Sequence, residues 1–101
     1  MSAELVWTGG AERDLQEIYE HMFDGAGEDL AAEFMQTVDK SVGLLREFPE
    51  IAPVFIAPIR RLLVGKGRHG VFYSIQPRGV IIHAVQDLRQ NPESILRRLG
   101  L

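Results

Sequence analysis

The chain has 101 residues, of which 46% are hydrophobic and 25% are charged, as in an ordinary globular protein and unlike a disordered or fibrous one. This length suits one domain, so we expect residues 1–101 to fold as a single domain around one core. The absence of cysteine excludes disulfides, thiol nucleophiles and cysteine-based zinc sites. With neither a signal sequence nor an apolar run of about 20 residues, we expect a cytosolic protein that makes no membrane contact.

The net charge of −3 conceals a difference between the two halves of the chain. Residues 1–50 carry 12 acidic and 3 basic side chains, a net charge of −9, whereas residues 51–101 carry 2 acidic and 8 basic ones, a net charge of +6. A basic surface attracts phosphates or acidic chains over roughly a Debye length, which makes the second half the expected binding side. The alternative is that the two halves neutralise each other across their interface.

The acidic half has the pattern of a strand followed by two helices. Leu5–Trp7 favours a β-strand, and Thr8 is a suitable helix N-cap. Apolar residues spaced by three or four positions predict an amphipathic helix over Ala11–Met22 and a second one over Leu30–Phe48. The two glycines of Asp24–Gly27 predict a break between them, so the helices should form a hairpin with one apolar side.

The basic half changes to short β-favouring runs. Pro53 and Pro58 bracket a segment that we expect to be irregular, and three strands should follow, over 60–64, 71–76 and 80–85. Asn91 and Pro92 predict the start of a last short helix, which should end before Gly100. The expected fold is therefore α+β with the order β-α-α-β-β-β-α, in which the helical hairpin packs on a mainly antiparallel sheet.

A resemblance to a known family is carried by residues from the first strand to the last helix: Trp7-Thr8, Ala11, Asp14-Leu15, Ile18, Ala31-Ala32, Phe34, Leu45, Phe48-Pro49, Arg61-Leu62, the Gly65–Arg68 turn, Tyr73, Asp87, Arg89 and Asn91-Pro92. This pattern resembles the RelE/ParE superfamily of bacterial toxins, which are encoded beside an antitoxin. The resemblance covers nearly the whole chain. Most of these positions are structural, so they indicate the fold more strongly than the mechanism.

The resemblance implies one of two activities. RelE-like members cut messenger RNA on the ribosome, whereas ParE-like members inhibit DNA gyrase without known hydrolytic chemistry. Nuclease members often place a His, or an Arg followed by a Tyr, just after the last strand, where this chain has Gln86 and Leu88. Glutamine cannot take up a proton at neutral pH, so the sequence favours the ParE-like branch and we assign no catalytic residue.

Six residues of the basic half are the candidate contacts for a target or an antitoxin: Arg60, Arg61, Lys66, Arg68, His69 and Arg89. Adjacent strands could bring them together into one patch. The expected partners are DNA gyrase or a related topoisomerase and a cognate antitoxin with an acidic C-terminal segment, with no specific nucleic-acid binding. Two alternatives remain open: a RelE-like endonuclease that uses Arg61, Arg68, His69 and Tyr73, and a non-toxic family member that only binds antitoxin.

Several polar residues also have purely structural interpretations. His83 lies in an apolar run and should share a strand face with Ile81 and Val85, so we expect a hydrogen-bonded structural histidine. Tyr73 should be buried in its strand. His69 is flanked by a glycine-rich turn, where we expect an exposed ring. Three separated histidines without paired ligand spacing predict no metal site, and we expect no cofactor.

Overall fold

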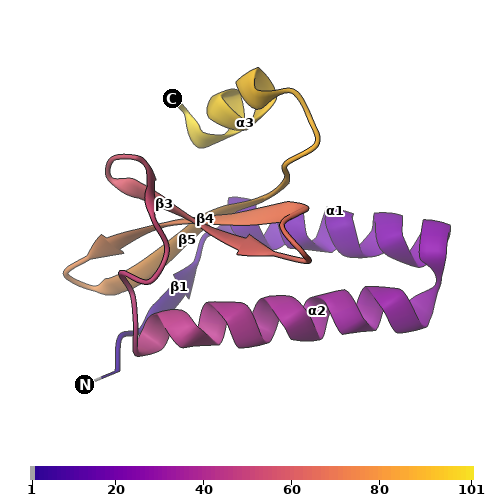
Figure 1. The fold of residues 1–101 in the computed structure, drawn as a ribbon, viewed down its shortest axis with the longest axis horizontal. Helices are drawn as coiled ribbons and strands as arrows, with labels where there is room; N and C mark the ends of the chain where they lie inside the picture. The colour runs from indigo at the N-terminus through magenta and orange to yellow at the C-terminus, as the bar shows by residue number, and fades with distance from the viewer. Residues whose placement is uncertain (1) are drawn as a thin grey trace.

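A five-stranded sheet lies between a helical hairpin and a short C-terminal helix in the computed structural model, which describes residues 2–101 (Figure 1). The strands are β1 (Leu5–Trp7), β2 (Val54–Ile56), β3 (Ile59–Val64), β4 (His69–Gln76) and β5 (Gly79–Asp87). The helices are α1 (Gly9–Ala26), α2 (Glu28–Gly43), the 3-10 turn η1 (Leu44–Arg46) and α3 (Pro92–Leu99). Within residues 2–101, no helix has the length and apolar character needed to cross a membrane.

The sheet has the strand order β1-β5-β4-β3-β2. Neighbouring strands are antiparallel except for β1 and β5, which are parallel. A parallel pair needs a long crossover connection, and the chain after β1 provides it through α1 and α2 before it enters the rest of the sheet. The expected α+β fold with a mainly antiparallel sheet is therefore confirmed. β5 is an inner strand between β1 and β4, and its burial on both faces agrees with its apolar sequence.

The helical hairpin turns at one residue instead of four. Thr8 caps α1 as predicted, since its side chain accepts a hydrogen bond from the Ala11 amide at 3.1 Å. The sequence predicted a break over Asp24–Gly27, but the observed break is narrower. α1 continues to Ala26, and only Gly27 leaves the helical conformation, with φ +93°. Only this position needs the left-handed freedom of glycine, while Gly25 is tolerated inside an exposed helical turn.

The second helix is shorter than its apolar pattern suggests. Phe34, Val38 and Val42 are buried against the sheet as expected, but Leu30 and Phe48 are 55% and 59% exposed. The α-helix ends at Gly43 and continues as the 3-10 turn η1, so the prediction of a helix reaching Phe48 is wrong. The spacing of apolar residues persists past the helix end because the chain turns tightly there before it leaves the core.

The segment between Pro53 and Pro58 is not irregular, as the sequence suggested, because Val54–Ile56 forms the edge strand β2 and pairs with β3. A three-residue strand is too short to display an alternating pattern. Prolines at both ends are compatible with an edge position, where one side of the strand needs no partner. The observed order therefore has one more strand than the predicted β-α-α-β-β-β-α.

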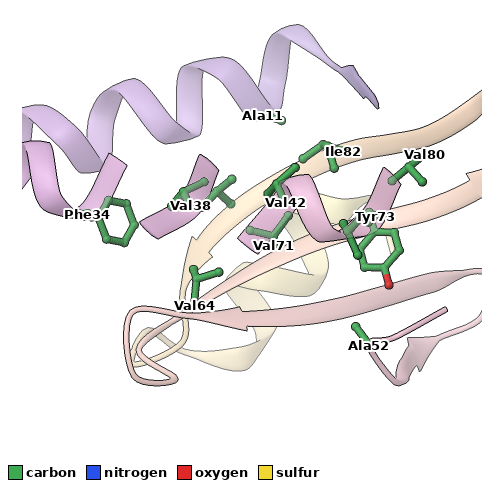
Figure 2. Close-up of a cluster of buried hydrophobic side chains, with 12 residues drawn as sticks. Ala11, Phe34, Val38, Val42, Ala52, Val64, Val71, Tyr73, Val80 and Ile82 are labelled. Carbon is green, nitrogen blue, oxygen red and sulfur yellow. The ribbon is translucent and has the colours of Figure 1, made fainter. Parts of the chain in front are cut away.

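Each face of the sheet has its own apolar core. Under the helical hairpin, Phe34, Val38 and Val42 of α2 pack against Val71 and Tyr73 of β4 (Figure 2). A smaller cluster on the opposite face contains residues of the sheet and of α3: Ile59, Phe72, Ala84 and Ile95. Figure 1 shows α3 on the opposite side of the sheet from α2. The burial of Tyr73 confirms the expectation from the sequence.

Side chains replace a strand along part of the β5 edge. β1 is three residues long and pairs only with the first part of β5. Further along, the His83 carbonyl accepts hydrogen bonds from Thr8 Oγ1 at 3.3 Å and Arg98 Nη2 at 3.2 Å. The Val85 amide donates to Asp14 Oδ2 at 3.0 Å, and Asp14 pairs with Arg98 through two contacts of 2.8 and 3.1 Å. We call these residues the β5 seam: Thr8, Asp14, His83, Val85 and Arg98.

A bulge at His83 changes the orientation of the residues that follow it. Phe72 pairs with Ala84 and Tyr73 pairs with Ile82, which leaves His83 without a partner on β4. Because of this extra residue, Val85 joins the core under the helical hairpin together with Ile82. The expected common face of His83 and Val85 is therefore wrong, since a strict alternation of faces holds only in an unbulged strand.

Candidate partner-binding groove

A groove opens where α1 and α2 pass the turn between β3 and β4. It consists of two adjoining hollows of about 310 and about 570 Å³, which share the lining residues His21, Met22, His69 and Arg89. Figure 1 shows that the connected ends of α1 and α2 extend beyond the sheet. The overhang comes from the placement of the helices, since the 18 residues of α1 span about 27 Å, a length similar to that of the 9-residue strand β5. The part that overhangs supplies one wall of the groove.

The wall formed by the helices has an apolar surface. Met22 of α1 and Leu30 and Phe34 of α2 line the larger hollow. Leu30 is more than half exposed, and Phe34 packs its ring against that of His69 with 4.8 Å between the ring centroids. The sequence pattern assigned Met22 and Leu30 to the buried face of the hairpin; Met22 does pack partly against the core, whereas Leu30 does not. A helical pattern identifies an apolar face, but the position of the helix on the sheet determines how much of that face is covered.

The opposite rim of the groove is basic. Lys66 and Arg68 are exposed in the turn, whose backbone has positive φ at Gly65, Lys66 and Gly67. Among residues 2–101, neither Lys66 nor Arg68 forms an ion pair. Two uncompensated positive charges therefore stand beside an apolar wall.

Arg89, the third cation of the groove, has a partner within the chain. Its guanidinium pairs with Asp87 at 2.7 Å and 3.1 Å. Hydrogen bonds from Arg89 lower the pKa of Asp87 to about 2, against the opposing effect of burial. Asp87 is thus ionised at neutral pH and offsets the Arg89 charge, so the free positive charge of the rim comes from Lys66 and Arg68.

His69 is buried, and the prediction of an exposed ring is wrong. The glycine-rich turn ends at Arg68, and His69 is the first residue of β4, where it pairs with Val64 and Asp87 and is only 4% exposed. Burial lowers the pKa of His69; nearby Asp87 opposes this effect, and Arg89 and Arg68 add to it. The ring is therefore mainly neutral at pH 7. Within residues 2–101, its Nδ1 atom is buried without a hydrogen-bond partner.

Arg60 and Arg61 lie outside the groove. The two residues are adjacent in β3, so their side chains point to opposite faces of the sheet. Arg60 Nη1 donates to the Ala52 carbonyl at 2.7 Å, while the Arg61 guanidinium lies 5.4 Å from the centre of the Phe55 ring. Of the six candidate contacts, the structure brings four together, namely Lys66, Arg68, His69 and Arg89.

The four residues of the alternative nuclease site do not converge. Tyr73 is fully buried under the helical hairpin, where its hydroxyl donates to the Pro49 carbonyl at 2.7 Å. Arg61 projects from the other face, and only Arg68 and His69 line the groove. A general base for the attacking hydroxyl and a general acid for the leaving oxygen must stand on either side of one phosphate, and this arrangement does not provide such a pair.

His83 has the hydrogen bond that the sequence predicted. Its Nε2 lies 2.7 Å from the hydroxyl of Ser74, a residue that is 1% exposed. Burial lowers the pKa of His83, and the charges of Arg78 and Arg98 lower it further. This histidine lies in the β5 seam and does not line the groove.

Comparisons with known proteins place the chain among bacterial toxins. Residues 5–92 match the family model described as ParE toxin of type II toxin-antitoxin system, parDE. A solved structure, that of the chromosomal ParDE TA system from P. aeruginosa, is similar to this fold with a TM-score of 0.75. It is 20% identical, and the similarity covers 85% of this chain and 96% of that one. No curated protein matches the chain by sequence.

Proposed function

We propose that this chain, which belongs to the ParE toxin family of type II toxin–antitoxin systems, inhibits DNA gyrase or a related topoisomerase and is neutralised by a cognate antitoxin. The observation that carries this proposal is the family match over residues 5–92. We further propose that the chain acts in the cytoplasm as a binding protein that traps its target without performing chemistry of its own.

We assign antitoxin binding to the groove. Its apolar wall and its basic rim, where Lys66 and Arg68 form no ion pair with any residue of 2–101, are complementary to a segment that carries both apolar and acidic side chains. Toxin surfaces of this kind suit a partner segment that folds as it binds, because apolar burial offsets the entropy lost on ordering. Lys66, Arg68, His69 and Arg89 are the proposed contacts.

We assign the contact with the topoisomerase to the other side of the sheet. Arg61 lies there, together with Leu63, which is 52% exposed, and α3 on the same side carries the exposed Arg97. These residues offer an exposed surface with basic and apolar character. Separate surfaces for target and antitoxin would let the antitoxin act on a toxin already bound to its target.

The test is a supercoiling and cleavage-complex assay with purified toxin and gyrase. We expect loss of supercoiling activity and accumulation of cleaved DNA at stoichiometric toxin, and recovery when the protein encoded by the adjacent reading frame is added. No effect at stoichiometric excess of folded toxin would contradict gyrase inhibition. New cuts in translated messages, detected by primer extension during growth arrest, would instead support the endonuclease.

Normal growth during accumulation of the folded chain without its antitoxin would identify a non-toxic binding module. This outcome separates the two parts of the proposal, because an inactive toxin can still bind the adjacent-frame protein. Pull-down of that protein on the purified chain is the matching measurement. Binding without growth arrest would retain the antitoxin contact and reject the toxic activity.

A further inference from the structure

The Nδ1 atom of His69 is the starting point, because a buried polar atom without a hydrogen bond is unfavourable. Within residues 2–101 it is the one buried side-chain nitrogen or oxygen that lacks a partner. Native proteins satisfy nearly all such atoms, and the exceptions require an explanation. The ring lines both hollows of the groove, so a ligand in the groove is the nearest source of a partner.

Nδ1 lies beneath the turn, where Gly65 leaves room for a single carbon atom. A Cβ atom added to Gly65 would lie 3.6 Å from Nδ1 and 3.5 Å from the Phe34 ring, both ordinary contact distances. Because Gly65 has no side chain, this space is unfilled. Lys66 and Arg68 flank the same turn and line the same hollow. Because Nδ1 has no contact with solvent, an acceptor must displace the turn to reach it, and it would then meet the histidine nitrogen and two cations.

We propose that this pocket captures a carboxylate of an amphipathic, acidic protein segment, which accepts a hydrogen bond from His69 Nδ1 while its apolar side chains cover Leu30 and Phe34. The proposal rests on the proposed function, because the segment would belong to the antitoxin. It adds the chemistry by which the partner is held: one buried acid at His69, with Lys66 and Arg68 neutralising its charge.

The composition of the walls favours a protein segment over a nucleic acid. Met22, Leu30 and Phe34 present apolar surface that phosphates and sugars would leave uncovered. Glu17 and Glu33 stand on the helical wall, where they repel a polymer that carries a negative charge at every unit. A peptide can place one carboxylate at the basic rim and apolar side chains along the helices.

Capture of a carboxylate should be linked to uptake of a proton by His69. An added negative charge at Nδ1 opposes the effect of burial and favours the protonated ring, so the pKa of His69 rises on binding. The affinity should then fall as the pH rises through the pKa of the bound ring. The other charged and titratable groups around the ring come from the turn, the end of β5, α1 and α2: Lys66, Arg68, Asp87, Arg89, Glu17, His21 and Glu33.

The probe is a capped amphipathic peptide of about 14 residues, roughly four helical turns, with leucines on one face and glutamates on the other. Its twin has every glutamate replaced by glutamine, and a single-stranded DNA of the same length serves as the nucleic-acid ligand. Fluorescence anisotropy with the full chain gives each affinity. We expect the acidic peptide to bind at least about tenfold more tightly than its twin, since a charged hydrogen bond to a buried group is lost in the twin.

Substitutions distinguish the contribution of His69 to peptide binding from that of the positive charge of the rim. His69→Gln should abolish the pH dependence of binding and most of the preference for the acidic peptide. The matched control His83→Gln, in the β5 seam, should keep both. Lys66→Gln and Arg68→Gln should each weaken the acidic peptide severalfold, whereas Arg78→Gln, exposed in the turn before β5, should not.

A spectroscopic readout keeps the test valid if His69→Gln does not fold. In the wild-type chain, the ring nitrogen resonances of His69 should shift with the acidic peptide and remain unchanged with the glutamine twin. Equal affinity for the two peptides, or tighter binding of the DNA, would overturn the inference. Gyrase inhibition is measured separately, so peptide binding without inhibition rejects the toxic activity alone, and inhibition without preference for acid rejects the carboxylate site alone.

Discussion

Two histidines on neighbouring strands show how this fold treats a structural and a functional polar group. His83 of β5 is bonded to Ser74, and its carbonyl accepts hydrogen bonds from two side chains of the β5 seam. His69 of β4 is more deeply buried, yet its Nδ1 has no partner within residues 2–101. A satisfied polar group holds the fold together, whereas an unsatisfied one lowers stability until a ligand completes it.

The β5 seam around His83 and the groove around His69 also differ in whether their polar groups are paired within the chain. The β5 seam joins α1, β5 and α3 through residues that are far apart in the sequence, as in the contact between Asp14 and Arg98. The groove lies where α1 and α2 extend past the sheet, and in the described part of the chain its cations at Lys66 and Arg68 form no ion pair. The seam is thus complete within the chain, while the groove is complementary to something outside it. Substitutions on both sides can test this difference.

The largest expected effect comes from opening the seam. Asp14→Ala removes the partner of Arg98 and the acceptor of the Val85 amide together, so we expect the free energy of unfolding to fall by about 3 kcal/mol. Urea denaturation measures this loss. Glu20→Ala, an exposed position on the same helix, is the control and should stay within about 0.5 kcal/mol of wild type. Equal effects at the two positions would show that the seam does not stabilise the fold.

Replacing each histidine by leucine compares the two sites directly. His83→Leu deprives the buried Ser74 hydroxyl of a partner and should cost about 1–2 kcal/mol of stability. His69→Leu removes an unsatisfied buried nitrogen, so the free energy of unfolding should stay the same or rise by up to about 1 kcal/mol. Paired urea denaturation curves at pH 7 give both values. A greater loss at His69 than at His83 would reverse the assignment of roles.

The pH dependence of stability should reflect the same burial. Both histidines have a pKa below 6.5 in the folded chain, mainly because of burial, so the unfolded chain binds protons more readily. Stability is therefore full above pH 6.5 and declines as the pH falls through 6.5 toward the lower pKa values of the folded state. Thermal unfolding between neutral and mildly acidic pH measures the decline. His69→Leu should make it shallower, and an unchanged slope would mean that His69 contributes nothing.

The smallest effect concerns the turn that presents the basic rim. Lys66 adopts φ +60°, a conformation that favours glycine. Lys66→Gly should therefore raise the free energy of unfolding by about 1 kcal/mol or less, while it weakens binding of the acidic peptide. Urea denaturation and fluorescence anisotropy measure the two effects. Arg68→Gly, at a position without positive φ, should bring no gain in stability, and a similar gain there would rule out relief of strain at Lys66.

The sequence predicted elements whose signals are local. The cap at Thr8, the apolar stripe of α2 from Phe34 to Val42 and the burial of Tyr73 follow from hydrogen-bonding residues and periodicity, and each is present. The opposite directions of Arg60 and Arg61 also follow from the twofold period of a strand. The prediction of one patch overlooked this period, because it grouped the two residues by their charge. These features need no knowledge of distant contacts.

The groove could not be predicted in the same way. The exposure of Leu30 depends on how far α2 extends past the sheet, which is set by how the helices and strands pack on each other. The burial of His69 depends on where β4 begins and on the Phe34 ring across the groove. Glycines on both sides of a residue indicate a turn, but they do not show that the ring is covered by another element.

Histidine side-chain NMR on the wild-type chain, recorded against pH with and without the protein encoded by the adjacent reading frame, tests the central claim most directly. We predict that this partner shifts the ring nitrogen resonances of His69 and raises its pKa, while those of His83, already bonded to Ser74, stay in place. Formation of a stable complex with an unchanged His69 ring would contradict the assignment of the groove as the antitoxin-binding site.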